Sequence, residues 1–289
     1  MADNMDVSSS PGLSQYQVAQ ADTRPTRPEP AAQKGSAESG PKKATGHSGV
    51  SSFHAADDYK RWERFAQEHN VPVQHGKVTV IGVRDQSRAD ALSGKTYEDK
   101  MVVLKKDGTT ATFEANTKPA QQPATPGAAP DVDGDKVMDV GMVRPGNYKA
   151  SAYKDFAGRP SYKVSTAPSN DQVPAWRDTN QDSTFSEEEK RASEARGDTL
   201  SAVRIHVGFD EAGSTLPNGS SGKGPWSIGC QNVPNSRMDE FVEAVGGRNA
   251  SFNYSVVDAP VERAENKPAP EQKPEAGESG GLLDGLFGR

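Results

Sequence analysis

Cysteine is almost absent from this sequence, and its scarcity limits the possible chemistry. The 289 residues contain one cysteine, Cys230, so an internal disulfide framework and a metal site built from several cysteines are both excluded. Long apolar runs are missing as well, because no stretch approaches the roughly 18 residues of a membrane-spanning helix. The first residues, MADNMDVSSSPGLS, do not have the basic-then-apolar order of a secretory signal.

Positive charge is not in excess either. The chain has 34 Lys and Arg against 40 Asp and Glu, which gives a net charge of −6 and a pI of about 5.5. This balance argues against nucleic acid or an anionic membrane surface as the main partner. Apolar residues (Ala, Val, Ile, Leu, Met, Phe, Trp, Tyr and Cys) make up only 33% of the chain. The sequence therefore has a polar surplus that must be located.

The surplus is concentrated in segments that we predict to be disordered. Residues 1–52 and 259–289 are largely built from Ser, Pro, Ala, Gly, Glu and Lys, and such tails bury too little apolar surface to offset the entropy of ordering. Residues 118–130 read as a Pro/Ala-rich linker. The C-terminal GLLDGLFGR is either a frayed end or a short docking peptide. Its apolar residues have helical spacing: Leu282, Leu283, Leu286 and Phe287.

Between the tails, the sequence predicts a mostly-β fold with a few short helices. Apolar alternation and turn residues predict these strands and hairpins: 77–85, 101–115, 146–165, 200–208 and 250–259. Helical spacing predicts a helix over 57–70 and a second one after position 236. Asn235 or Ser236 would N-cap this second helix, and Gly246-Gly247 would end it.

The same pattern suggests how the chain is divided. We assign residues 131–258 to the main domain, in which most of the candidate functional residues fall. Residues 53–117 carry a helix and strands of their own. They form either a small subdomain or an extension of the main sheet.

One acidic segment, residues 178–189, has the spacing of an EF-hand calcium loop. Its candidate oxygen ligands are Asp178, Asn180, Asp182, Thr184, Ser186 and Glu189. Calcium takes about six to eight oxygens, which a tightly wound loop brings to one point. Ser183 stands where the pattern has Gly. The segment predicts a structural Ca²⁺ site, and the alternative is an acidic turn that N-caps the helix after it.

A second acidic segment, DVDGDKVMD over 131–139, repeats this arrangement. It has four carboxylates at odd spacing: Asp131, Asp133, Asp135 and Asp139. Because it has no Glu at the twelfth position, it resembles the shorter calcium loops of extracellular repeats more than an EF-hand. A solvated turn rich in Asp explains the segment equally well.

The single cysteine lies in WSIGCQN, 24 positions after His206, which sits near the end of the strand-like RIHVG. A cysteine nucleophile needs a base within reach to form thiolate, and backbone donors for the oxyanion that follows. A histidine on a strand that faces a Gly-Cys turn could be the base. Gly229 lets the backbone turn, so that neighbouring amide N–H groups could bind the oxyanion. A lone cysteine is more often a buried small hydrophobe, so this pattern alone is weak.

A family resemblance strengthens the pattern. Ile-His-x-Gly, then a Gly/Ser-rich stretch, then Ser-x-Gly-Cys-x-Asn and an amphipathic helix resembles the catalytic domain of L,D-transpeptidases, the YkuD-like family. The similarity spans roughly 138–258 and includes an upstream Arg-Pro-Gly-Asn-Tyr at 144–148. It implies a β-sandwich or barrel with the following site residues: Cys230 as nucleophile, His206 as base, Ser227 and Gly229 in the turn, and Asn232 after it. The sequence departs from the family at Gln231, where an apolar residue is usual.

The resemblance implies acyl transfer on peptidoglycan. The Cys230 thiolate would attack an amide carbonyl of a stem peptide, and His206 would carry the proton to the leaving amine. Water or a second amine would resolve the thioester, which makes the enzyme a carboxypeptidase, an endopeptidase or a transpeptidase. We expect residues 209–225 to form a mobile lid, with Trp226 and Tyr148 in the cleft or the core.

Two other functions fit the same sequence. One is a catalytically inactive, calcium-stabilised binding module, and the other is a structural component of a secretion system or phage particle that binds a partner through its tails. Peptidoglycan lies outside the cytoplasmic membrane. For the enzyme we therefore expect delivery to the periplasm or cell envelope by a specialised secretion system or phage. If it is not delivered in this way, we expect the protein to remain cytoplasmic.

Overall fold

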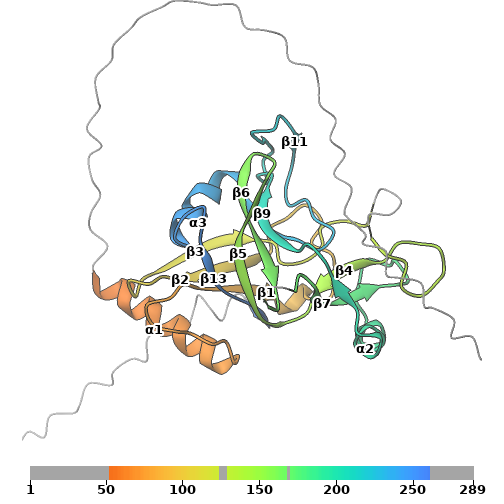
Figure 1. Ribbon diagram of the computed structural model, residues 1–289, viewed down its shortest axis with the longest axis horizontal. Coiled ribbons are helices and arrows are strands. Elements are labelled where there is room, and N and C mark those ends of the chain that lie inside the picture. The colour runs from red at the N-terminus through yellow and green to blue at the C-terminus, as the bar shows by residue number, and fades with distance from the viewer. Residues whose placement is uncertain (1–51, 124–128, 168–169, 261–289) are drawn as a thin grey trace, which may run out of the picture.

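The structure is a computed structural model that describes residues 52–123, 129–167 and 170–260 (Figure 1). The predictions for residues 1–51 and 261–289, including the docking peptide, lie outside these ranges. The described chain is mostly β with three α-helices, so the predicted fold class is confirmed.

An eight-stranded sheet in the order β12-β9-β6-β5-β13-β1-β2-β3 forms the centre of the molecule. Its strands are β1 (Thr79–Asp85), β2 (Asp99–Leu104), β3 (Thr110–Ala115), β5 (Gly146–Phe156), β6 (Arg159–Ser165), β9 (Arg204–Gly208), β12 (Gln231–Pro234) and β13 (Ser251–Ala259). A three-stranded sheet joins β4 (Val140–Val143), β7 (Val173–Asp178) and β8 (Thr199–Leu200). β10 (Ser214–Thr215) and β11 (Ser221–Gly222) make a small hairpin.

The two edges of the large sheet meet, so that it is nearly a closed barrel. Asn116, just after β3, bridges to Asn232 in β12. The Asn116 N–H donates to the Asn232 carbonyl at 2.9 Å, and the Asn232 N–H donates to the Asn116 carbonyl at 2.8 Å. Because β12 also pairs with β9, it is held from both sides. Asn232 thus lies where the barrel closes.

Helices cover the barrel on two sides (Figure 1). α1 (Ser52–Glu68) buries Trp62 in a cluster with the outward side chains of β1 and β2, among them Ile81 and Val102. α3 (Met238–Ala244) inserts Phe241 into the main core, where its ring meets Phe113 edge-on at 5.4 Å. α2 (Glu187–Arg196) packs against β7. Two 3₁₀ turns complete the list, η1 (Gln86–Arg88) and η2 (Asn235–Arg237).

Most predicted elements are present, with shifts at their ends. The hairpin turn at Gly108 has the expected positive φ of 76°, and Gly246 and Gly247 end α3 with positive φ. The predicted N-cap of the second helix is wrong, because neither η2 nor α3 has a side-chain cap. Ser236 instead donates its hydroxyl to Asp210 at 2.8 Å. The predicted strand 200–208 is two strands, β8 and β9, separated by Ala202 at φ 55°.

Two domain boundaries take a different form in the structure. β1, β2 and β3 belong to the same sheet as the later strands, so residues 79–115 extend the main sheet and are not a separate subdomain. The predicted linker begins at Lys118, but Lys118 and Ala120 are fully buried or nearly so. They are ordered by specific hydrogen bonds and an ion pair that composition does not reveal.

Candidate active site

Strand register brings the predicted catalytic residues to one face of the sheet. β9 and β12 run parallel, with Ile205 opposite Gln231 and His206 opposite Asn232. Successive side chains of a strand alternate between faces. Ile205 points into the core, so Arg204 and His206 share the opposite face. Cys230 directly precedes β12 and lies beside Arg204 across the strand pair.

His206 is buried and held by a backbone carbonyl. Its Nδ1 lies 2.7 Å from the Val207 carbonyl oxygen, which only accepts, so Nδ1 carries the proton of the neutral ring and Nε2 is free to act as a base. A backbone carbonyl, and not a carboxylate side chain, thus orients the imidazole. Burial, partly opposed by the Val207 bond and reinforced by the charge of Arg204, lowers the pKa of His206 to about 4.

Two further residues pack on the imidazole. The Asn232 amide nitrogen is 3.2 Å from Nδ1 and 3.3 Å from Nε2, and these nearly equal distances put it over the ring, away from the lone pair of Nε2. The Phe156 ring lies 3.9 Å from the imidazole, centre to centre. The ring orientation is therefore fixed by β5, β9 and β12 together.

The turn before Cys230 is locked by the residues of the Ser-x-Gly-Cys pattern. The Ser227 hydroxyl accepts the Gly229 N–H at 3.0 Å and donates to the Cys230 carbonyl at 2.6 Å. Gly229 has φ 151°, and a Cβ there would lie 3.1 Å from the Gly141 carbonyl oxygen and 3.1 Å from Leu200. Glycine is required both by this conformation and by the close approach of β4.

Cys230 is half-buried and is not hydrogen-bonded to His206 among the described residues. Burial raises the pKa of its thiol, while the backbone N–H and the charge of Arg204 act in the opposite direction. Burial therefore favours the neutral thiol and the neutral imidazole, which lie on the same face of the sheet. Catalytic hydrogen bonds often tighten only when substrate binds, so this geometry is compatible with a Cys-His pair.

An aromatic and cationic surface adjoins the thiol. Trp226 is 42% exposed, and its ring lies 5.9 Å from Phe156 and 6.1 Å from Phe209. The Arg204 guanidinium sits 4.8 Å from the centre of the Tyr153 ring, which is 39% exposed. Such a surface suits a peptide with carboxylate groups. The sequence argument missed Arg204, although its place two residues before His206 on a strand puts it on the same face.

Gln231, the departure from the family pattern, has a structural explanation. It points to the core side, where its Oε1 accepts the buried Tyr254 hydroxyl at 3.0 Å. Its Nε2 donates to the Gly229 carbonyl at 3.4 Å. A glutamine at this position satisfies a tyrosine hydroxyl that an apolar residue would leave unpaired. The polar side chain therefore does not reach the active face.

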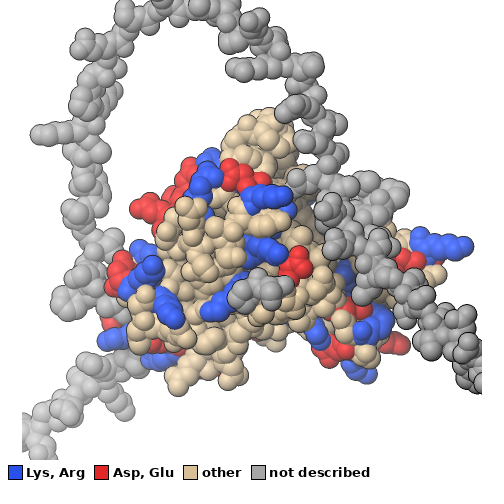
Figure 2. All heavy atoms as spheres, viewed as in Figure 1, with Lys and Arg blue, Asp and Glu red and all other residues tan. Residues whose placement is uncertain are grey.

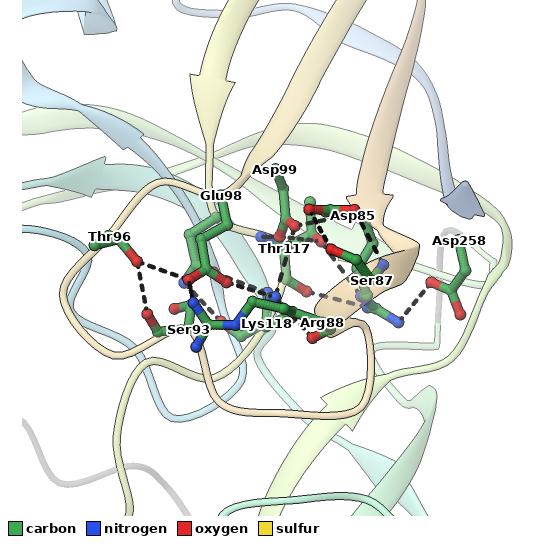
Figure 3. A network of polar contacts seen from close by, with 12 residues as sticks. Asp85, Ser87, Arg88, Ser93, Thr96, Glu98, Asp99, Thr117, Lys118 and Asp258 are labelled. Carbon is green, nitrogen blue, oxygen red and sulfur yellow. Dashed lines mark hydrogen bonds and ion pairs between the residues drawn. The ribbon is translucent and has the colours of Figure 1, made fainter. Parts of the chain in front are cut away.

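A buried network of charged residues supports the segment that faces the Cys230 turn (Figure 3). Lys118 points toward Glu98 and Asp99, with its Nζ 2.9 Å from Glu98 Oε2 and 3.9 Å from Asp99 Oδ1. Asp99 accepts the Thr117 N–H at 2.7 Å and its hydroxyl at 2.8 Å. The fully buried Arg84 donates to the carbonyls of Thr117 and Val143.

This network places residues 116–121 against the active site. The Ala120 N–H donates to the Ser227 carbonyl at 2.8 Å, and Asn116 bridges to Asn232. Nothing in the sequence indicated the network, because its partners are far apart along the chain. Its role is to hold the turn and the barrel closure, and none of its charges reaches the thiol.

The EF-hand-like loop has the expected wound shape. Ser183 adopts φ 69°, the left-handed conformation that the pattern assigns to Gly. Ser186 and Glu189 form a capping box at the start of α2, and Glu189 also accepts the Thr179 N–H at 2.9 Å and the Asn180 N–H at 3.2 Å. Both Glu189 oxygens are thus used by the loop itself. Metal binding by Asp178, Asn180, Asp182, Thr184 and Glu189 stays a prediction.

The shorter acidic loop brings its carboxylates closer together. Asp131, Asp133 and Asp139 have oxygens that all lie within 4.8 Å of one another, the one such acidic group within the described residues. Asp135 is not part of this group, and its carboxylate accepts the Val137 N–H at 2.7 Å. Three converging carboxylates suit a divalent cation and do not by themselves select calcium.

The predicted lid, residues 209–225, is a hairpin built from β10 and β11. It buries Leu216 and is joined at its base by the Phe209 N–H, which donates to the Gly224 carbonyl at 3.1 Å. Beside it is a hollow lined by Lys95, Thr96, Glu211, Ala212 and Lys223. Lid motion stays a prediction. Tyr148, the other predicted cleft residue, lies in the core, with its hydroxyl on the Arg144 carbonyl.

No protein-family model matches this chain, and no curated protein matches it in sequence. Among the described residues, none of the helices is long and apolar enough to cross a bilayer.

Acidic and basic side chains are intermixed on the face shown in Figure 2, and side chains of both charges lie close together over α2.

Proposed function

We propose that the protein is a cysteine-dependent acyltransferase or hydrolase that acts on peptidoglycan stem peptides, in the manner of L,D-transpeptidases. The observation that carries the proposal is the parallel register of β9 and β12. It sets His206 opposite Asn232 and Cys230 beside Arg204, on a face that is open to solvent at Trp226. The family resemblance of these same residues supplies the substrate class.

The proposed reaction begins at Cys230. As substrate binds, His206 Nε2 takes the thiol proton and the sulfur attacks the amide carbonyl. The carbon–nitrogen bond then breaks, His206 returns the proton to the leaving amine, and a thioester remains on Cys230. Water or the amine of a second stem peptide releases the acyl group. Burial raises the pKa of the thiol and lowers that of His206, so both groups are neutral in the free protein and the proton transfer has to be driven by bound substrate.

Arg204 supports the substrate assignment. Its charge lies beside the thiol and its guanidinium rests on aromatic rings, which fixes its direction. A guanidinium of this kind binds a carboxylate by charge-assisted hydrogen bonds. Stem peptides have free carboxylates near the bond that is cut. Because this substrate lies in the cell envelope, we place the site of action in the periplasm, after delivery by a secretion system or phage.

The test is the incubation of purified muropeptides with the wild-type protein and with Cys230→Ala. We expect cleaved or cross-linked products in mass spectra with the wild type only, because a side chain without sulfur forms no thioester. Ser251→Ala, at the exposed first position of β13, is the control and keeps the activity. Equal product with and without the Cys230 sulfur would refute the proposal.

The absence of a Cys230–His206 hydrogen bond favours a second candidate, an inactive binding module with the same fold. It predicts binding of muropeptides without turnover and a thiol that resists alkylation near pH 7. Retained binding by Cys230→Ala together with no wild-type product would select this candidate.

A further inference from the structure

Asp139 has a buried carboxylate oxygen that its surroundings leave unsatisfied. The residue is fully buried, and its Oδ2 accepts the Val132 N–H at 2.7 Å, while Oδ1 has no hydrogen-bond partner in the part of the chain that the structure describes. Burial, reinforced by the charges of Asp133 and Asp131, raises the pKa of Asp139 to about 6. A buried carboxylate without a partner is costly, and a cation is the partner that removes this cost.

The neighbouring residues fit a cation. Asp131 and Asp133 bring oxygens to within 4.8 Å of Asp139. Arg177 donates to the Asp139 backbone carbonyl at 3.1 Å and the charge of Arg196 acts on Asp133 and Asp139, but among the described residues no Lys or Arg forms an ion pair with any of the three carboxylates. The loop is wound by its own backbone, since Asp131 accepts the N–H groups of Gly134 at 2.6 Å and Lys136 at 2.9 Å. Lys136 has φ 73°, so the loop is held tight without a Gly there.

We propose that Asp131, Asp133 and Asp139 bind one divalent cation of the calcium class, and that this cation holds β4 against the turn that carries Cys230. The ligands are hard oxygens on a short irregular loop, which Ca²⁺ accepts more readily than Mg²⁺ with its strict octahedron. The effect of the cation on the Cys230 turn rests on the proposed function in one respect, because that function is what makes the turn catalytic.

A short path of contacts joins the acidic loop to the turn. Asp139 is followed directly by β4, and the carbonyl of Gly141 packs on Gly229. The side chain of Leu200 covers both glycines. Ile228, in the turn itself, packs on the cluster that contains Val140. Fixing Asp139 therefore fixes the strand on which the Cys230 turn rests.

The first experiment measures cation binding by the full-length protein after treatment with EDTA. Titration with CaCl₂ is expected to give a Kd below about 1 mM and a rise in Tm of roughly 5 °C at saturation. Asp133→Asn keeps the acceptor for the Asp135 N–H and so is expected to fold, yet to weaken Ca²⁺ binding at least about tenfold. Asp171→Asn, at an exposed aspartate that pairs with Lys163, removes the same charge elsewhere and is expected to bind as the wild type does.

Three results would overturn the cation site. The first is a wild type whose Tm does not change in 10 mM Ca²⁺, about ten times the expected Kd. The second is an unchanged Kd in Asp133→Asn, and the third is a Tm that rises with Mg²⁺ and not with Ca²⁺. A third variant separates the two acidic loops. Asp182→Asn is expected to keep the binding, and its loss there with retention in Asp133→Asn would move the site to the 178–189 loop.

The second experiment measures the link to the active site. Cys230 is the only cysteine, so its rate of alkylation by iodoacetamide reports on this turn alone. We expect alkylation to be about threefold faster in EDTA than in Ca²⁺, because the half-buried thiol opens when β4 loosens. Asp133→Asn should react at the fast rate in both buffers. Equal rates in a wild type whose Tm responds to Ca²⁺ would overturn the link. Neither readout uses peptidoglycan, so failure here and failure of the proposed reaction are distinct results.

Discussion

The Arg84–Asp99–Lys118 network and the His206–Cys230 face lie in the same sheet and differ in how their polar atoms are satisfied. In the network, the Arg84 guanidinium, the Lys118 ammonium and the Asp99 carboxylate all meet partners inside the protein. On the candidate active face, the Cys230 thiol and Nε2 of His206 form no ion pair with any described residue, and the charge that acts on both is that of Arg204. The comparison indicates that the cluster whose polar atoms make the most hydrogen bonds and ion pairs supports the fold. A reaction requires polar atoms that are still able to bond to a substrate, and these lie on the candidate active face.

The largest expected effect that separates the two clusters is on stability. Asp99→Ala removes the acceptor of the Thr117 N–H and hydroxyl and of the Asp85 N–H in a buried site, so we expect a loss of about 3–5 kcal/mol in the free energy of unfolding. Urea denaturation measures it. Glu114→Ala, at an exposed position of the neighbouring strand, is the control and should change stability by less than about 0.5 kcal/mol. A loss below about 1 kcal/mol for Asp99→Ala would mean that the network does not hold the fold.

A second effect comes from the low pKa of His206. The unfolded chain takes up this proton near pH 6.5 and the folded protein only near pH 4, so the folded state loses stability as the pH falls through this window. The loss is up to about 3 kcal/mol. His206→Gln, which has no titrating group, should lack this loss, while the opposite contribution of Asp139 is the same in both proteins.

Denaturation curves from about pH 4 to about pH 7, a range that spans the folded and unfolded pKa values of His206, measure the difference. If the wild type and His206→Gln lose stability in parallel over this window, the imidazole is not buried in its neutral form. The active face would then be more solvated than its contacts indicate.

The smallest of the three effects concerns Arg204. Arg204→Gln keeps a hydrogen-bond donor and removes the charge beside the thiol, so we expect KM for muropeptides to rise about tenfold with a smaller change in kcat. Steady-state kinetics with Lys163→Gln, a cation over the same Tyr153 ring, is the matched comparison. An unchanged KM would place the substrate carboxylate elsewhere.

Sequence patterns could predict the parts of the fold that depend on local spacing. The strands, the two hairpins and the helix ends at glycine follow from periodicity and turn residues, and Ser227 and Gly229 form the turn that their pattern indicates. β4 and β7 were not predicted because both are buried almost throughout and therefore lack alternation. The two acidic loops show a further limit. Spacing predicts a wound loop, and only the structure shows that Glu189 is used by the backbone while Asp139 keeps a free oxygen.

The site depends even more on contacts that are distant in sequence. His206 and Cys230 are 24 positions apart, and their proximity follows from the parallel register of two short strands. The Asn116–Asn232 bridge and the Lys118–Glu98 pair join segments that no local pattern connects. Sequence patterns could thus single out the candidate residues, whereas the contacts that support them could not be predicted.

The most direct test of the central claim is the mass of the intact protein during reaction with muropeptides. A covalent thioester on Cys230 would add the mass of the donor acyl group to the wild type, would map to the peptide that contains Cys230, and would be absent from Cys230→Ala. The account predicts this adduct, together with its loss when an acceptor amine is added. Release of products with no adduct at any time, or an adduct on another residue, would contradict it.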